Sequence, residues 1–249
     1  MISYCESAPP TKTPDAEGLI DCRMQTLDAC YGALPGAPDW YYVSDSGGVF
    51  CRFGGTLLVT GVPDFGELLS FADLLGVGRI EWTSPWDEKT HSLMGWTSQS
   101  YPVLRCTGQG TPISEKLQTD IRLRRCFEIL CASDAEFARE ADYLPWLSDM
   151  TRRRNAGRAE AFLYDDAAVA CMTAKGRRCA YLSSVAVLPE RRGEGLGLAL
   201  LHAVRAYAAL CGLTLYTAAQ FEPLMAFYQK AGFQALPQRL IITEKRNLT

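Results

Sequence analysis

The sequence predicts an α/β fold in which a mixed sheet is flanked by helices. Strand-like runs of apolar and β-branched residues alternate with segments whose apolar residues recur at helical spacing. In one place the two are joined by a glycine-rich loop. A strand expected over 181–187 is followed by glycines at 193, 195 and 197, and then by a helix expected over 196–210. The length of 249 residues suits two domains.

Composition excludes several classes of protein. Hydrophobic residues make up 48% of the chain, which is too many for a disordered protein. No apolar run reaches the ~18 residues of a membrane span, and the first residues lack the pattern of a secretory signal. The 10 cysteines are scattered without a C-x-x-C motif, and there are only 2 histidines. We therefore expect no metal site, reduced thiols and a cytoplasmic location.

In the first half of the chain, a helix is expected over 21–31 and strands over 40–43, 49–53, 56–60 and 78–83. Asp64 is the expected N-cap of a second helix, with Glu67 as its capping-box partner and Gly76 at its end. We expect residues 1–115 to form an N-terminal α/β domain. Gly108, Gly110 and Pro112 would mark its boundary with a second domain, residues 120–249.

The second half predicts the order β-α-β-β-β-α-β-α-β. A strand is expected over 124–131, and a helix from Ser133 or Asp134 to Arg154 that Pro145 breaks or kinks. A hairpin over 158–174 would turn at Asp165 and Asp166. The glycine-loop strand and helix follow. After them come a strand over 213–217, a helix that starts near Pro223, and one or two strands over 233–243.

The glycine loop has the properties of an anion site. It opens a helix, whose unpaired N–H groups and dipole favour negative charge, and its glycines allow close approach of a phosphate. It is not a Walker loop, because no lysine follows the glycines, and it lacks the G-x-G-x-x-G spacing of dinucleotide-binding loops. The observed pattern is Val185-x-Val187-x-Pro189 followed by Arg192-x-x-Gly195-x-Gly197.

This pattern resembles the acyl-CoA loop of the GCN5-related N-acetyltransferase (GNAT) superfamily, and the resemblance covers roughly residues 124–249. It implies a GNAT-type central sheet and binding of acetyl-CoA or another acyl-CoA. The main chain around Val185, Ala186 and Val187 would pair with the pantetheine arm. The pyrophosphate would contact the loop residues, which are Arg192, Gly193, Glu194, Gly195, Leu196 and Gly197.

The segment from Pro223 to Phe233 resembles the closing helix of the same family. The resemblance implies that Tyr228 contacts the cofactor and protonates the departing thiolate. Family members often carry an asparagine seven residues before this tyrosine, where this chain has Phe221. For the general base, Glu160 is the first candidate. Asp142, Glu140, and Ser183 or Ser184 acting through water remain alternatives.

Charge supports an anionic cofactor. Residues 1–120 hold 15 acidic and 7 basic residues, whereas residues 121–249 hold 13 and 18, so the net charge of −3 combines −8 and +5. Nucleic acid is not expected, because the basic run at residues 152–154 is short and has no aromatic neighbours.

We thus expect an enzyme that moves an acetyl group from acetyl-CoA to a primary amine of a small molecule, peptide or protein. The alternative is a non-catalytic acyl-CoA-binding module. Residues 1–115 would be a degenerate GNAT-like half that acts as lid and scaffold without its own cofactor. Glu81, Asp87 and Glu88 could line its entrance for a cationic amine. The protein would act as a monomer or homodimer, without membrane partners.

Overall fold

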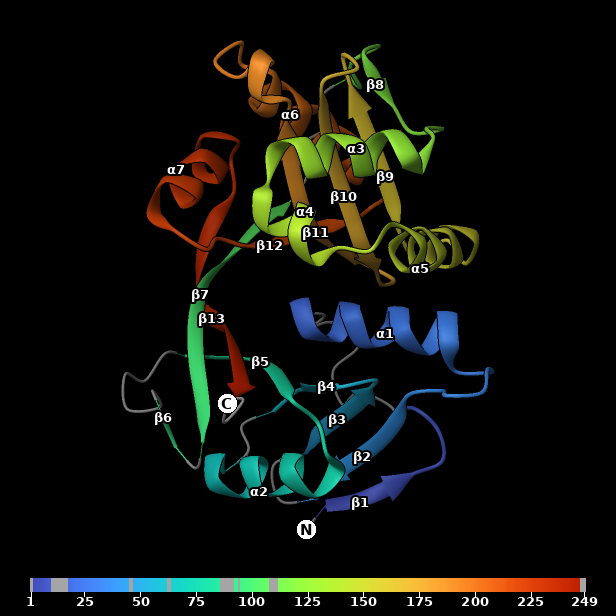
Figure 1. Cartoon of the computed structure of the whole chain (residues 1–249), viewed down its shortest axis with the longest axis vertical. Helices are drawn as coiled ribbons and strands as arrows, with labels where there is room; N and C mark the ends of the chain where they lie inside the picture. Colours follow the sequence, from blue (N-terminus) through green and yellow to red (C-terminus); the bar gives the residue numbers. More distant parts are fainter. Residues whose placement is uncertain are drawn as a thin grey trace.

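The computed structural model describes residues 2–9, 18–44, 47–61, 64–85, 92–93, 95–107 and 112–246. Asp87, Glu88, Gly108 and Gly110, to which roles were given above, lie outside these ranges. Figure 1 shows two lobes stacked along the long axis of the molecule and joined by long strands. In the described part of the chain, no helix is both long and apolar enough to cross a membrane.

The lower lobe in Figure 1 is the N-terminal lobe, which comprises the described residues from 2 to 101 and residues 239–246. The helices over 21–31 and after Asp64 are confirmed, as are the four expected strands. The elements are β1 (Ile2–Cys5), α1 (Leu19–Tyr31), β2 (Asp39–Val43), β3 (Gly48–Phe53), β4 (Thr56–Val59), α2 (Phe65–Leu75), β5 (Arg79–Pro85), β6 (Ser92–Leu93) and the first part of β7 (Trp96–Thr107).

The upper lobe is the C-terminal lobe, which comprises the described residues from 103 to 235. Its hairpin turns at Asp165 and Asp166, whose φ angles of 53° and 51° are those of a two-residue hairpin turn. The elements are β8 (Leu117–Gln118), α3 (Leu123–Ser133), α4 (Ala135–Glu140), α5 (Tyr143–Asn155), β9 (Glu160–Tyr164), β10 (Ala168–Lys175), β11 (Cys179–Val187), the 3₁₀ turn η2 (Pro189–Arg191), α6 (Leu196–Leu210), β12 (Thr214–Ala218), α7 (Glu222–Lys230) and the start of β13 (Gln234–Lys245).

The strand expected over 124–131 is wrong, because this segment is the helix α3. Its buried residues Leu123, Cys126, Ile129 and Leu130 are spaced three or four apart around one face, which is helical and not alternating spacing. The exposed Arg124 and Glu128 form an ion pair on the other face. The short strand β8 takes the position of the first strand instead, paired with β9.

The next helix also differs from the prediction. It does not break at Pro145 but earlier, so that α4 and α5 are separate helices. Asp134 caps α4 and Asp142 caps α5, each through its carboxylate. Pro145 lies in the first turn of α5, where its missing N–H costs no hydrogen bond. The helical region is therefore longer than expected.

In the described part of the chain, the two lobes exchange strands within one 13-stranded sheet. Twelve strands follow the order β1-β2-β3-β4-β5-β13-β7-β12-β11-β10-β9-β8, and β6 pairs with β7 beside this path. In the N-terminal lobe, β13 of the second half of the chain lies between β5 and β7. In the C-terminal lobe, residues Val103 to Thr107 of β7 pair with β12. Each lobe is thus completed by a strand from the other half of the chain.

Helices cover both faces of the C-terminal lobe. On one face, α6 buries Leu200 and Val204 against Phe162, Met172 and Leu182 of the sheet. On the other face, α3 and α5 both pack against β9 and β10. α1 lies between this lobe and the N-terminal sheet, with Leu19 and Ile20 nearly inaccessible.

Candidate active site

β11 and β12 begin as a parallel pair and then diverge. They pair from Cys179 opposite Thr214 to Tyr181 opposite Tyr216. After that point, β11 continues along β10, whereas the end of β12 pairs with β7. A bulge at Ser183 marks the point of divergence, because Leu182 and Ser184 pair with consecutive residues of β10. The result is a wedge-shaped opening between two adjacent strands, called the gap below.

Some main-chain N–H and C=O groups of β11 point into the gap instead of pairing with β10. The amide of Leu188 donates to the carbonyl of Ala167 at 2.9 Å. In an antiparallel ladder such bonds alternate, so Ala186 bonds toward β10 while Val185 and Val187 point away from it. The Val187 carbonyl indeed accepts from Ser133 Oγ at 3.0 Å. Val185 and Val187 therefore face the gap, and Ala186 does not.

The glycine loop closes one end of the gap with an anion-binding geometry. Gly193 and Gly195 have φ angles of 87° and 77°, which only glycine adopts without strain. Gly195 is the N-cap of α6 and gives it no side-chain cap, and the first intrahelical bond runs from Ala199 N to Gly195 O. The N–H groups of the first turn, Gly197 included, therefore point out of the helix end.

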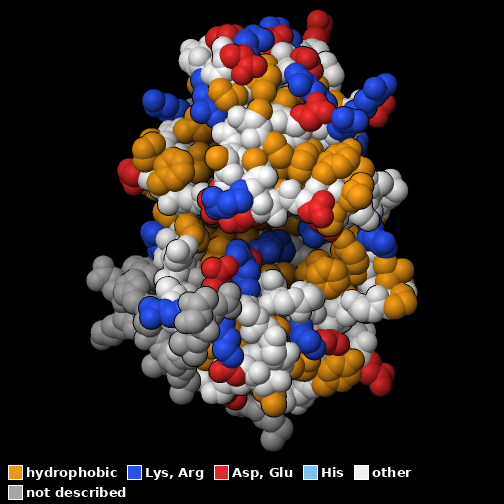
Figure 2. Space-filling view, viewed as in Figure 1, with side chains coloured by type: hydrophobic (Ala, Val, Ile, Leu, Met, Phe, Trp, Pro, Cys, Tyr) orange, Lys and Arg blue, Asp and Glu red, His pale blue; other side chains and the backbone are white. Residues whose placement is uncertain are grey.

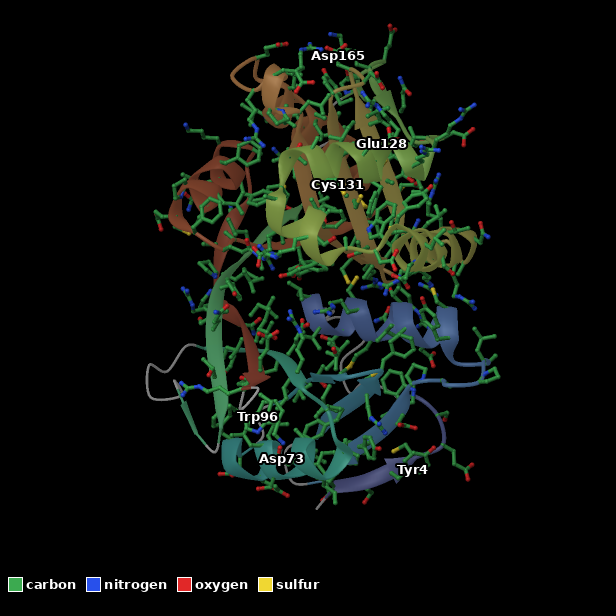
Figure 3. The ribbon with its side chains drawn as sticks, in the orientation of Figure 1. Tyr4, Asp73, Trp96, Glu128, Cys131 and Asp165 are labelled. Carbon is green, nitrogen blue, oxygen red and sulfur yellow. The ribbon has the colours of Figure 1, made fainter. Side chains whose placement is uncertain are left out.

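The charged side chains of the loop are fixed to the surrounding structure. Arg192 donates to the Ser133 carbonyl at 2.8 Å and to the Val187 carbonyl at 3.3 Å, so it ties the loop to the end of α3. Glu194 forms an ion pair with Arg191 at 2.7 Å. Arg191 also contacts Asp165 in the hairpin turn, which Figure 3 labels at the upper end of the molecule. These contacts hold the loop in the shape that exposes its N–H groups.

Tyr228 lies at the other end of the gap. Its side chain is only 3% exposed, and burial raises the pKa of Tyr228 to about 12, although a hydrogen bond with Thr217 acts in the opposite direction. Thr217 belongs to the diverging end of β12, and the ionised form of Tyr228 would also interact with Tyr181, the last paired residue of β11. The phenol is thus a protonated group where the two strands separate.

Glu160 has other partners. Its carboxylate lies 3.5 Å from Arg154 Nε and accepts a hydrogen bond from the Tyr207 hydroxyl at 3.4 Å. It lies on β9, which β10 separates from β11, whereas Tyr228 contacts Thr217 at the end of β12. The structure therefore does not bring the two expected catalytic residues together.

The alternative bases are placed as follows. Asp142 caps α5, and exposed Glu140 pairs with Arg139 at 3.2 Å. Ser183 is exposed at the bulge, and its hydroxyl lies 3.4 Å from that of Ser184. Of these groups, only the two serines lie on the strand that borders the gap.

The N-terminal lobe contacts the start of the gap through Arg23 of α1. The guanidinium lies 5.8 Å from the centre of the Tyr181 ring and bonds to Glu81 of β5. Glu81 is 4% exposed and also pairs with Arg79 at 2.7 Å. Burial alone would raise the pKa of Glu81, but the two arginines hold it below its usual value. Glu81 is therefore not the open entrance carboxylate that the sequence suggested.

Three contributors to this site were missed in the sequence. Ser133 was considered only as a helix cap, yet it binds the Val187 carbonyl. Thr217 is one of two threonines in β12, and Arg23 is the arginine of α1. No local pattern distinguishes them. Only the parallel alignment of the strands after 181 and 216 could have pointed to Thr217.

The comparisons with known proteins agree with this geometry. Residues 122–233 match the model of the Acetyltransferase (GNAT) family, which confirms the resemblance seen in the sequence. A GCN5-related N-acetyltransferase from Kribbella flavida has a TM-score of 0.56 at 12% identity, covering 93% of this chain and 97% of that chain. One from Sphaerobacter thermophilus has a TM-score of 0.54 at 14% identity, covering 99% and 96%.

A tandem GNAT protein from the clavulanic acid biosynthesis pathway covers 100% of both chains, with a TM-score of 0.51 and 12% identity. At such identities the likeness concerns the fold, and it fits a chain built of two GNAT-like lobes. The comparison with curated proteins finds no match.

Proposed function

Because residues 122–233 carry the GNAT family pattern, we propose that this chain transfers an acetyl group from acetyl-CoA to a primary amine of a small molecule, peptide or protein. The observation that carries the proposal is the gap between β11 and β12. Main-chain groups line one edge of it, the N-terminus of α6 lies at one end, and a protonated tyrosine lies at the other.

The residues present fit coenzyme A. The N–H groups of the loop and of the first turn of α6 would hold the diphosphate, in a loop where Gly193 and Gly195 leave no side chain in the way. The main chain of Val185 would pair with the pantetheine arm as an added strand would. When bound, acetyl-CoA supplies an acetyl thioester that an amine can attack.

Tyr228 would act as the proton donor to the leaving sulfur. With its pKa raised to about 12, the phenol stays protonated at neutral pH, and burial excludes water around it. In the overall reaction, the amine nitrogen forms an amide bond and the C–S bond breaks. Of the two ammonium protons that leave, one goes to solvent through a water that Ser183 or Ser184 can hold. The other replaces the proton that Tyr228 gives to the thiolate.

The N-terminal lobe would serve as lid and scaffold without a cofactor of its own. Its helix α2 corresponds in order to α6, but Asp64 caps it, with the carboxylate accepting from the Glu67 amide at 2.9 Å. A carboxylate at the N-terminus of α2 repels a phosphate. It also accepts from the Glu67 amide, which a bound phosphate would need as a donor. β4 and β5 also pair along all of β4, from Thr56 to Val59, so no gap opens between them.

Titration of the full chain with acetyl-CoA in a calorimeter, followed by measurement of free thiol release with a panel of amines, tests the proposal. We expect one acetyl-CoA bound per chain and release of thiol that depends on the amine. Binding without release for any amine would support the non-catalytic module instead. Absence of binding at millimolar acetyl-CoA would contradict both.

A further inference from the structure

A cavity of about 620 Å³ lies where the two lobes meet, and this volume is typical of sites for small molecules. Figure 2 shows a recess between the lobes on the face turned to the viewer. Residues of both lobes line the cavity, namely 98–101 of β7, Glu136 of α4, Gln220 after β12 and Arg239 of β13. Most of these side chains are polar, and among the described residues of the wall only Tyr101 offers an aromatic ring. The cavity therefore suits a polar ligand that can also lie against one ring.

The cavity adjoins the end of the gap where Tyr228 lies, without including it. The amide of Ala219 donates to the Pro102 carbonyl at 3.0 Å, which joins the end of β12 to the cavity strand β7. Gln220 follows Thr217, the hydrogen-bond partner of Tyr228, by three residues, which span at most ~11 Å. Neither Tyr228 nor a residue of β11 lines the cavity. A group of the acceptor that lies in the cavity is therefore not the reacting nitrogen.

Of the two charged side chains in the wall, one is already engaged. Arg239 donates from Nε to the Ser100 hydroxyl at 2.5 Å and from a terminal nitrogen to the Ser100 carbonyl at 3.2 Å, and it has a further partner. Glu136 is exposed, and no described residue forms an ion pair or a hydrogen bond with its carboxylate. The charge that remains available to a ligand is thus negative, and a carboxylate binds an ammonium group.

The ring of Tyr101 lies near this carboxylate. Burial raises the pKa of Tyr101, and Arg79 opposes this effect. The charges of Glu244 and Glu136 raise the pKa further, so the Glu136 carboxylate lies within electrostatic reach of the phenol. The Tyr101 hydroxyl donates to Gln99 Oε1, which fixes the ring in the wall. Because the face of a tyrosine ring attracts cations, the ring and the carboxylate favour the same kind of ligand.

We propose that this cavity binds a second cationic group of the acceptor, and that the acceptor is a diamine or polyamine. Its distant ammonium group lies at Glu136 and against the ring of Tyr101, while the reacting nitrogen extends toward Tyr228. Arg239 repels a cation, so the distant ammonium group is directed to Glu136, which belongs to the other lobe. The inference rests on the proposed acetyl transfer and narrows its primary amine to one that carries a second amine.

The test compares aliphatic diamines with monoamines of the same chain length, namely putrescine with butylamine and cadaverine with pentylamine. Thiol release by the full chain is followed at saturating acetyl-CoA. We expect kcat/KM for at least one diamine to exceed that of its monoamine at least about tenfold. Glu136→Gln should raise KM for that diamine about fivefold, toward the value of the monoamine. Tyr101→Leu should raise it about threefold more than Tyr101→Phe does, because only the leucine removes the ring.

The matched control is Glu128→Gln on α3, which Figure 3 labels in the upper lobe, and it should leave KM for the diamine unchanged. Equal kcat/KM values for diamines and monoamines overturn the inference and leave the acetyl transfer standing. So does an equal rise of KM for both amines in Glu136→Gln, because the carboxylate would then serve the reacting nitrogen.

Calorimetric titration of the full chain with cadaverine, in the presence of coenzyme A, separates the two proposals. Binding that Glu136→Gln weakens, without thiol release from any amine, overturns the acetyl transfer and keeps the cavity as a diamine site. Absence of both binding and thiol release overturns the two proposals together.

Discussion

Gly197 of α6 lies directly against Phe227 of α7. A Cβ atom at residue 197 would come within 3.2 Å of Phe227 Cζ and 3.3 Å of Val187 Cγ2. The three residues belong to the three elements that surround the gap, namely the helix after the glycine loop, the helix of Tyr228 and the strand β11. The absence of a side chain at residue 197 therefore sets how closely these elements approach at the diphosphate end.

We predict that Gly197→Ala weakens acetyl-CoA binding about tenfold, which corresponds to about 1.4 kcal/mol. The added methyl group must push Phe227 or Val187 outward by a few tenths of an ångström, which alters the shape of the gap. Calorimetric titration with acetyl-CoA measures the effect. Gly78→Ala is the matched control, because a Cβ there meets nothing within 4 Å. Equal affinities of the two variants would show that the contact does not shape the cofactor site.

Replacement of Tyr228 by phenylalanine should lower kcat by about a hundredfold and change KM little. The ring stays packed against Phe233, so the change removes the proton donor and leaves the helix in place. Since burial raises the pKa of Tyr228 to about 12, its ionisation should not reduce kcat of the unmodified protein below pH 10. Steady-state rates between pH 6 and 10, measured as thiol release, check both statements.

Tyr207→Phe is the control for that experiment, because its hydroxyl contacts Glu160 and not the gap. If Tyr207→Phe lowers kcat as much as Tyr228→Phe, the catalytic group belongs to Glu160 and its partners. An unchanged kcat in Tyr228→Phe would remove the tyrosine from the mechanism.

The sequence predicted the parts of the site that depend on neighbouring residues. The loop from Gly193 to Gly197 and the helix that carries Tyr228 were foreseen, because glycine spacing and helical periodicity are local. The strand expected at 124–131 was wrong, although the helical spacing of Cys126, Ile129 and Leu130 was already present in the sequence. Contacts between distant segments, such as Arg23 with Glu81 and Tyr181, leave no trace in local patterns.

Glu81 should be a main source of acid-dependent stability. Its folded pKa lies below the usual 4.5, so its contribution is fully present above that pH and is lost as the pH falls toward the folded value. Glu81→Gln should lower the free energy of unfolding by about 3 kcal/mol at pH 7, because two arginines lose their buried partner. Denaturant unfolding at pH 7 and pH 4 measures this.

The difference between Glu81→Gln and the unmodified protein should shrink at pH 4. As a control, Asp39→Asn removes a more exposed pair with Arg52 and should cost less than about 1 kcal/mol. A constant difference between pH 7 and pH 4 for Glu81→Gln would contradict the prediction.

Two buried thiols should make the protein sensitive to alkali. Burial raises the pKa of Cys51 and of Cys126 from 9.0 to about 12, and both side chains are inaccessible to solvent. Their folded pKa lies above the unfolded one, so their stabilisation is complete below pH 9 and is lost as the pH rises toward 12.

The free energy of unfolding should therefore fall by up to ~1.4 kcal/mol per pH unit for each thiol above pH 9. In the window from pH 9 to 10, the double variant Cys51→Ala, Cys126→Ala should show a shallower slope than the unmodified protein. Cys211→Ala, which removes an exposed thiol, should keep the full slope. Identical slopes in all three proteins would assign the alkaline loss to other groups.

The exchange of β7 and β13 makes the lobes depend on each other. A C-terminal fragment of residues 110–249 lacks β7, so the edge of β12 and residues 238–245 of β13 lose their partners. We predict that this fragment alone neither folds nor binds acetyl-CoA.

Co-expressed with residues 1–109, the fragment of residues 110–249 should form a stable 1:1 complex that binds acetyl-CoA as the whole chain does. Co-purification and calorimetry measure this, and a fragment of residues 110–237, without most of β13, should fail to retain residues 1–109. If 110–249 alone is monomeric and binds acetyl-CoA with full affinity, the C-terminal lobe is an independent domain and the exchanged strands are dispensable for its site.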